Sequence, residues 1–189
     1  RKRNLKIKIA PDIPEINFAQ NKKDIVWSMK PLKIIFLSRI SSIKNLDFAI
    51  NVLKDLKINI HFEIVGPIGD KEYWEYCLKL LEELPPNISY NYFGSIKHKE
   101  VREIISNSHL FFLPTKSENY GHTIFESLSA GTPVLISNQT PWRNLSKHNA
   151  GWDLPLLNQY DFVESINKLS KLSSKQYKKK RLDALKFVR

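Results

Sequence analysis

Apolar and polar residues follow two patterns that alternate along the chain. Short apolar runs of strand length recur from residue 33 onward, and most are followed by apolar residues at helical spacing. The runs that predict strands are residues 33–38, 61–66, 88–93, 109–114, 133–137 and 151–154. The stretches that predict helices are residues 46–56, 74–84, 101–105, 123–130 and 162–169.

The predicted strands are apolar throughout instead of at every second residue, which is typical of a parallel sheet covered on both faces. Strands that alternate with helices predict an α/β fold, here a doubly wound, Rossmann-like parallel sheet of about six strands. With the common order 3-2-1-4-5-6, a ligand lies outside the carboxyl ends of the strands where the order reverses, between strands one and four. The loops that follow Ser38 and Pro114 are therefore the candidate binding loops.

Three segments are expected from these patterns. Residues 1–30 contain one alternating Lys-Ile stretch and a Pro-rich turn, which predicts an N-terminal extension or linker. Residues 31–172 hold all the predicted strands and form the expected Rossmann-like domain. Residues 173–189 predict a basic C-terminal helix.

The net charge of +11 calls for a partner or an explanation. Nucleic acid, an anionic membrane and a phosphorylated substrate are the candidate partners of a basic chain. Aromatic and Gly-rich RNA-binding signatures are missing from both ends, so nucleic acid is not expected. Near the C-terminal end, a solvated helix face and a contact with an anionic membrane explain the excess equally well. The cations of that cluster are Lys175, Lys178, Lys179, Lys180 and Arg181.

Neither a membrane-spanning apolar run nor a signal-peptide pattern occurs in the sequence. We therefore expect a cytoplasmic protein, either free or peripheral to the inner face of the membrane. Cys77 is the single cysteine, which excludes an internal disulfide and a Cys-based metal cluster. Its place in a helical pattern predicts a buried small hydrophobic side chain.

Two cations lie in the loop after the first predicted strand. No Gly-x-Gly-x-x-Gly follows any strand and no Walker motif occurs, so a dinucleotide dehydrogenase is poorly supported. Arg39 and Lys44 suit a diphosphate, the first as a bidentate fork and the second as a mobile point charge. Taken alone, however, the loop is explained more simply by two surface cations of a basic protein.

Two carboxylates bracket a glycine in the loop after the fourth predicted strand. Glu118 precedes the predicted helix, and Glu126 lies about one turn inside it. The free N–H groups from Gly121 to Thr123 form an anion site, and Gly121 lets a phosphate approach the backbone. Carboxylates repel a phosphate, so the hydroxyl groups of a sugar and a ribose are their natural partners. The alternative is that both carboxylates only favour the positive end of a helix.

The stretch ENYGHTIFESLSAGTPVLIS resembles the Glu-x7-Glu signature of glycosyltransferase family 4. These are retaining glycosyltransferases with two facing Rossmann domains, known as the GT-B fold, and the resemblance covers roughly residues 31–170. It implies that Glu118 contacts hydroxyls of the donor sugar and that Glu126 holds the ribose. It also implies that Arg39 and Lys44 grip the diphosphate.

The resemblance implies the other walls of the donor pocket as well. Residues 93–96 would line the base, with the main chain at Ile96 as the polar contact, and Gly66 and Pro67 would flank the pocket. The implied catalytic residues are Arg39, Lys44 and Glu118. The implied donor-binding residues are Ser38, Arg39, Lys44, Gly66, Pro67, Phe93, Ser95, Ile96, Glu118, Asn119, Tyr120, Gly121, His122, Thr123 and Glu126.

The expected function is therefore transfer of a sugar from a nucleoside diphosphate sugar to a glycan or lipid-linked acceptor, in surface polysaccharide synthesis and with retention of configuration. This chain would be the C-terminal, donor-binding half of such an enzyme and inactive without its N-terminal Rossmann domain. No metal or other cofactor is expected, since the chain has no Asp-x-Asp pair. The alternatives are a non-catalytic nucleotide-sugar-binding module and a sugar-nucleotide epimerase of the same fold.

Two single residues and one short segment depart from the family pattern. Ser38 and Asn45 stand where the first loop usually has glycines, and residues 138–142 (NQTPW) replace a common Gly-Gly followed by Glu. The role of Trp142 is open between an acceptor contact and packing. His122 has two interpretations, a general base and a helix-start residue whose backbone N–H lies near phosphate, and the motif favours the second.

Overall fold

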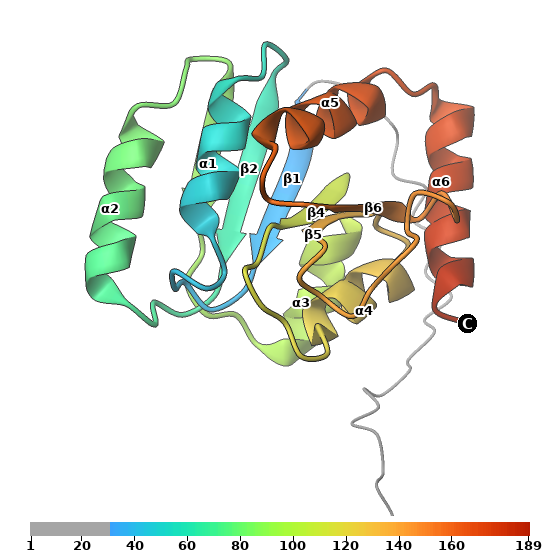
Figure 1. Cartoon of the computed structure of the whole chain (residues 1–189), viewed down its shortest axis with the longest axis horizontal. Coiled ribbons are helices and arrows are strands. Elements are labelled where there is room, and N and C mark those ends of the chain that lie inside the picture. Colours follow the sequence, from blue (N-terminus) through green and yellow to red (C-terminus); the bar gives the residue numbers. More distant parts are fainter. Residues whose placement is uncertain (1–30) are drawn as a thin grey trace, which may run out of the picture.

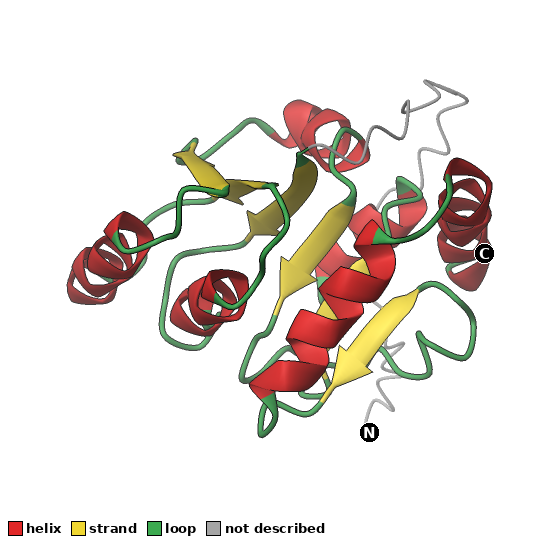
Figure 2. Ribbon diagram, turned by 90° about the horizontal axis from the view of Figure 1, so that it is seen from above, coloured by secondary structure: helices red, strands yellow, loops and turns green. Residues whose placement is uncertain are grey.

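The computed structural model describes residues 31–189, which form one six-stranded sheet with helices on both of its sides (Figures 1 and 2). The strands are β1 (Leu32–Leu37), β2 (Ile60–Val65), β3 (Ile88–Tyr92), β4 (Leu110–Leu113), β5 (Val134–Ser137) and β6 (Gly151–Leu154). The helices are α1 (Leu46–Lys54), α2 (Lys71–Glu82), α3 (His98–Ser106), α4 (His122–Ser129), α5 (Gln159–Ser170) and α6 (Ser174–Phe187). The predicted extension at residues 1–30 lies outside the described residues.

The sheet confirms the predicted topology. Its strand order is β3-β2-β1-β4-β5-β6, and all five pairings are parallel. The order reverses between β1 and β4, which pair over Ile34↔Leu110 and Ile35↔Phe111. Each strand end differs from the predicted one by at most one residue.

The helices separate into two layers. Helix α1 contacts α2 and α5, whereas α4 contacts α3 and α6. This is the arrangement expected of a doubly wound sheet, whose crossovers run to opposite faces on either side of the reversal point. Each helix among residues 31–189 is too short or too polar to span a bilayer.

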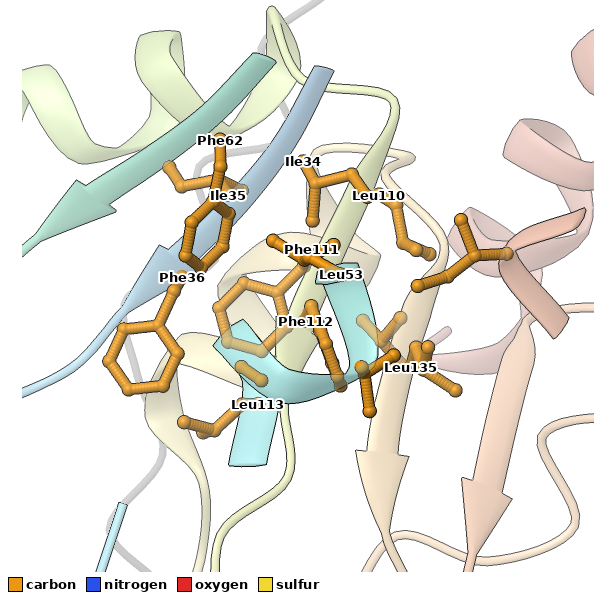
Figure 3. Packing of buried hydrophobic residues seen from close by; sticks show 14 of the residues in the cluster. Ile34, Ile35, Phe36, Leu53, Phe62, Leu110, Phe111, Phe112, Leu113 and Leu135 are labelled. Carbon is orange, nitrogen blue, oxygen red and sulfur yellow. The ribbon is translucent and has the colours of Figure 1, made fainter. Parts of the chain in front are cut away.

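The core is centred on β1 and β4. Figure 3 shows apolar side chains of both strands close together, with Phe62 of β2, Leu135 of β5 and Leu53 of α1 around them. The side chains of Ile34, Ile35 and Phe36 are fully buried, which explains the uninterrupted apolar run of this strand. Cys77 is buried in α2, as its helical pattern predicts.

Helix α6 packs on the domain through part of its basic sequence. The hydroxyl of Tyr177 donates to the carbonyl of His109 at 2.9 Å. Lys180 is 5% exposed, and its ammonium lies 4.0 Å from the centre of the Trp152 ring. Burial lowers the pKa of Lys180 to about 8. Arg181 donates to backbone carbonyls at the C-terminal ends of α3 and α4.

The expectation that the whole C-terminal cluster is exposed, on a solvated face or at a membrane, is wrong for Lys180 and Arg181. Lys180 is buried and Arg181 is half-buried, because the long aliphatic stems of both side chains pack while their charged ends find partners. Lys175, Lys178 and Lys179 are exposed, so the basic surface of α6 is smaller than the sequence suggests.

Asn45 supplies the N-cap of α1 and fixes the first loop. Its backbone is left-handed, with φ of 62° and ψ of 42°, and its side-chain amide donates to the carbonyl of Pro114 at 2.9 Å. Asparagine tolerates this conformation better than most residues. The residue therefore meets the backbone demand that a glycine would meet, and it adds a buried bond between the two loops.

We expect Asn45→Ala to lower the free energy of unfolding by about 2 to 3 kcal/mol, because alanine is strained in the left-handed region and leaves the Pro114 carbonyl without its partner. Asn45→Gly keeps the backbone conformation and should cost about 1 kcal/mol. Urea unfolding of both variants measures the difference. Asn107→Ala, at an exposed helix end with φ of −83°, is the matched control. Equal losses for the alanine and glycine variants would contradict the backbone argument.

Candidate functional site

The loops after β1 and β4 meet at the reversal point of the sheet, as the topology predicts. The ammonium of Lys44 lies 2.6 Å from Oε2 of Glu118. Two further bonds join the loops: the N–H of Lys116 donates to the carbonyl of Ile43 at 2.7 Å, and the hydroxyl of Thr115 donates to the same carbonyl at 3.1 Å. The structure thus brings together two residues that are 74 positions apart in the sequence.

The loop after β2 closes against the loop after β1. Gly66 has φ of 138°, and a Cβ on it would lie 1.9 Å from the carbonyl oxygen of Ser38. The N–H of Gly66 donates to the carbonyl of Gly94 at 2.8 Å, and the N–H of Ile40 donates to the carbonyl of Pro67 at 2.9 Å. The close approach to Ser38 excludes any side chain at position 66. The two hydrogen bonds connect the loops after β1, β2 and β3 to one another.

Arg39 is exposed, and its aliphatic stem packs over Gly69, a residue that the sequence analysis did not single out. A Cβ on Gly69 would lie 2.6 Å from Cδ and 2.7 Å from Cγ of Arg39. Gly69 therefore gives the stem of Arg39 a path over the loop after β2. The signal available in the sequence was its position directly before Asp70, which caps α2.

The N-terminus of α4 lies beside the two loops. Gly121 is the N-cap with φ of 81° and accepts hydrogen bonds from the N–H groups of Ile124 and Phe125 at 2.9 and 3.0 Å. The first N–H groups of a helix point out of its end and carry partial positive charge, so the start of α4 suits an anion. The positive φ of Gly121 favours glycine, and a Cβ here would also lie 2.8 Å from Cδ1 of Ile124 and 3.0 Å from Nε1 of Trp142.

Glu126 occupies a half-buried position on α4. Burial raises the pKa of its carboxyl above the ordinary value, and the charges of His98 and His122 act in the opposite direction. Its Oε1 lies 3.8 Å from Nδ1 of His98, the first residue of α3. Sequence reasoning missed His98, and its place just after the predicted base loop was the available signal.

The predicted base loop follows β3 directly. The side chain of Phe93 is 47% exposed, Ser95 is exposed and Ile96 is half-buried. The hydroxyl of Tyr92 donates to the carbonyl of Gly66 at 3.0 Å, which ties this loop to the loop after β2.

The remaining predicted donor-binding residues lie between Glu118 and α4. Asn119 is exposed, whereas the ring of Tyr120 is half-buried, 4.8 Å from the ring of His122. The indole N–H of Trp142 donates to the carbonyl of Tyr120 at 2.6 Å. Trp142 therefore has a packing role beneath this loop.

This arrangement has distinct electrostatic parts. One edge carries Arg39 and Lys44, and the helix start at Gly121 adds the partial positive charge of its N–H groups. Glu118, which precedes that helix start, and Glu126, which lies inside α4, supply acceptors for hydroxyl groups. Together these groups can bind a ligand that has an anionic part and hydroxyl groups.

The fold recurs in solved glycosyltransferases. WaaG, which is involved in lipopolysaccharide biosynthesis, matches with a TM-score of 0.69 at 19% identity over 85% of this chain and 44% of its own. HepE from Anabaena, in complex with UDP-glucose, matches with a TM-score of 0.69 at 15% identity over 83% of this chain and 43% of its own. Trehalose-6-phosphate synthase, studied for glycosyl transfer with retention, matches with a TM-score of 0.67 at 12% identity over 82% of this chain and 41% of its own.

These neighbours are GT-B glycosyltransferases, and the chain spans less than half the length of each of the three. No curated protein sequence matches it significantly. The family model of the group 1 glycosyl transferases matches residues 17–183, which is most of the chain. The chain therefore belongs to the group 1 glycosyltransferase family.

Proposed function

We propose that this chain is the donor-binding half of a retaining glycosyltransferase that moves a sugar from a nucleoside diphosphate sugar to a glycan or lipid-linked acceptor. The observation that carries the proposal is the meeting of Lys44 and Glu118 beside the N-terminus of α4. A diphosphate needs the cation and the helix start, and a sugar needs the carboxylate. The complex of HepE with UDP-glucose supports the same class of donor.

Arg39, Lys44 and the start of α4 would stabilise the leaving nucleoside diphosphate. Cleavage of a sugar–diphosphate bond leaves additional negative charge on the departing group, and preorganised positive groups lower the energy of that transition state. These groups supply the charge from the protein itself, so we propose a reaction that requires neither a metal nor another cofactor. The work on trehalose-6-phosphate synthase supports retention as the stereochemical outcome.

The ion pair of Lys44 and Glu118 would rearrange when the donor binds. A diphosphate offers Lys44 a stronger anionic partner, and the sugar offers Glu118 hydroxyl donors. Each member of the pair therefore gains a new partner at the moment it loses the old one, which limits the cost of separating two half-buried charges.

Glu126 would hold the ribose hydroxyls. A carboxylate that is partly removed from water gains from hydroxyl donors, because it is poorly solvated without them. His98, which lies 3.8 Å from Glu126, directly follows the base loop in the chain, and in that loop Phe93 would offer its exposed ring and Ile96 its main chain to the base.

The wider setting belongs to the same proposal. Residues 31–172 would form the donor domain with α6 appended, residues 1–30 would be the linker, and the acceptor would bind to a separate N-terminal Rossmann domain. We place the enzyme in the cytoplasm and in surface polysaccharide synthesis. The exposed cations Lys175, Lys178 and Lys179 would make its peripheral contact with anionic membrane, and no nucleic-acid partner is proposed.

The proposal predicts that Arg39→Ala and Lys44→Ala weaken the binding of a nucleoside diphosphate by about 1.5 to 3 kcal/mol each, the range for hydrogen bonds to charged groups. The nucleoside alone should bind almost unchanged, because it lacks the diphosphate. Calorimetric titration of uridine against UDP, with the guanine and adenine pairs in parallel, measures the contrast. Lys57→Ala is the control, because Lys57 is exposed and lies before the amino end of β2, at the other end of the strands from the proposed site. Equal losses for nucleoside and diphosphate would mean that the loop acts on the base or on folding.

We expect Glu126→Gln to stabilise the unliganded chain at neutral pH. A carboxyl whose pKa is raised in the folded state favours the protonated form, so stability falls as pH rises from the ordinary Glu pKa through the raised value. Glutamine does not ionise, so the two unfolding curves should coincide in acid and separate as pH increases. Urea unfolding across this range tests it, with Glu75→Gln on the exposed face of α2 as control. A constant difference at all pH values would exclude ionisation as the cause.

The 189-residue chain should bind the donor but transfer nothing. Transfer requires donor and acceptor to be held close and aligned, and all strands among residues 31–189 belong to one sheet that presents only the donor side. Transfer from a radiolabelled nucleotide sugar, assayed with and without a separately expressed N-terminal domain, measures this. Transfer by the chain alone at the rate of the two-domain enzyme would overturn it. Donor binding without transfer in the restored enzyme would favour a non-catalytic module.

A further inference from the structure

The loop after β5 is bonded to residues 118–120, the segment that carries Glu118. No part of the function proposed above uses this loop. The N–H of Glu118 donates to the carbonyl of Gln139 at 3.1 Å. The indole N–H of Trp142 donates to the carbonyl of Tyr120 at 2.6 Å. The loop thus grips residues 118–120 at two points, one through its backbone and one through a side chain.

Trp142 is itself held firmly. Its backbone N–H donates to the hydroxyl of Thr140 at 3.2 Å, and Thr140 is only 2% exposed. Its ring centre lies 6.3 Å from that of Phe125 on α4 and 6.3 Å from that of Phe187 at the end of α6. The indole is therefore fixed between two helices, and its N–H has a defined direction.

The bond from Trp142 fixes the orientation of one peptide group. The carbonyl of Tyr120 and the N–H of Gly121 belong to the same planar unit and point in opposite directions. A peptide that precedes glycine is free to rotate, because glycine accepts both signs of φ. With its carbonyl bound to the indole, this peptide directs the Gly121 N–H away from Trp142, and Gly121 keeps φ of 81°.

We propose that Trp142 is a positioning residue that holds the Tyr120–Gly121 peptide so that the Gly121 N–H can donate to the diphosphate of the donor. The inference rests on the proposed donor-binding function and assigns a role to a residue outside the family motif. Hydrogen bonding at the Tyr120 carbonyl also polarises the peptide and strengthens its N–H as a donor. Trp142 thus acts on an anion that it does not touch.

The test separates the indole N–H from the indole ring. Trp142→Phe keeps an aromatic side chain between Phe125 and Phe187 and removes the donor to Tyr120. We expect UDP to bind roughly three- to tenfold more weakly, the loss of one ordinary hydrogen bond, while uridine binds as in the wild type. A chain with benzothienylalanine at position 142 keeps the size of tryptophan without the N–H and should show the same selective loss. Trp152→Phe, at the half-buried tryptophan beneath Lys180, is the matched control.

Three results would overturn the inference, and they are distinguishable. If the wild-type chain binds none of UDP, GDP and ADP in calorimetric titration, the proposed function fails and this role fails with it. If the wild type binds UDP and both position-142 variants bind it equally well, only the role of Trp142 fails. If the variants lose affinity for uridine and UDP alike, Trp142 supports the fold of the loop and does not orient the peptide.

Discussion

The parallel pairing of β1 with β4 is the interaction on which the rest of the site depends. The two strands pair over only two residue pairs, Ile34↔Leu110 and Ile35↔Phe111, and their apolar side chains form the centre of the core. Because the crossovers on either side run to opposite faces of the sheet, the loops after the two strands face each other with no helix between them. The bond from Asn45 to the Pro114 carbonyl then fixes the distance between these loops.

The meeting of these two loops allows a cation and a carboxylate to lie partly buried in one site as an ion pair. The cations come from the loop after β1 and the carboxylates come from the segment after β4, so the sheet reversal brings the two signs together. In the structure Lys44 and Glu118 neutralise each other at 2.6 Å. Oε1 of Glu126 lies 3.8 Å from Nδ1 of His98, and burial raises the pKa of this carboxyl although the charges of His98 and His122 oppose the shift.

The sequence predicts the framework of this protein well, because the framework follows from periodicity. Apolar runs predict the inner strands β1, β4 and β5 most clearly, whereas β2, β3 and β6 carry polar residues and are only partly buried. The alternation of strands with helices predicts their parallel pairing, and the strand order places the two loops together. The bond between Lys44 and Glu118 could not be predicted, since it depends on side-chain reach across 74 residues. The same holds for Gly69 beneath Arg39 and for the buried Lys180, whose basic neighbours indicate an exposed helix face. These features are set by tertiary distances, which leave no periodic signal in the chain.

Two of the three departures from the family pattern strengthen the support of the site. Asn45 keeps the left-handed conformation of a glycine and adds a buried side-chain bond, while Trp142 adds a donor to the Tyr120 carbonyl. Both replace conformational freedom in the unliganded loops with fixed contacts. Ordering a loop is a cost that binding otherwise has to meet, so contacts that order it beforehand leave more of the interaction energy for the ligand. These substitutions leave the cations Arg39 and Lys44 and the carboxylates Glu118 and Glu126 in place, and they act on the loops that hold those side chains.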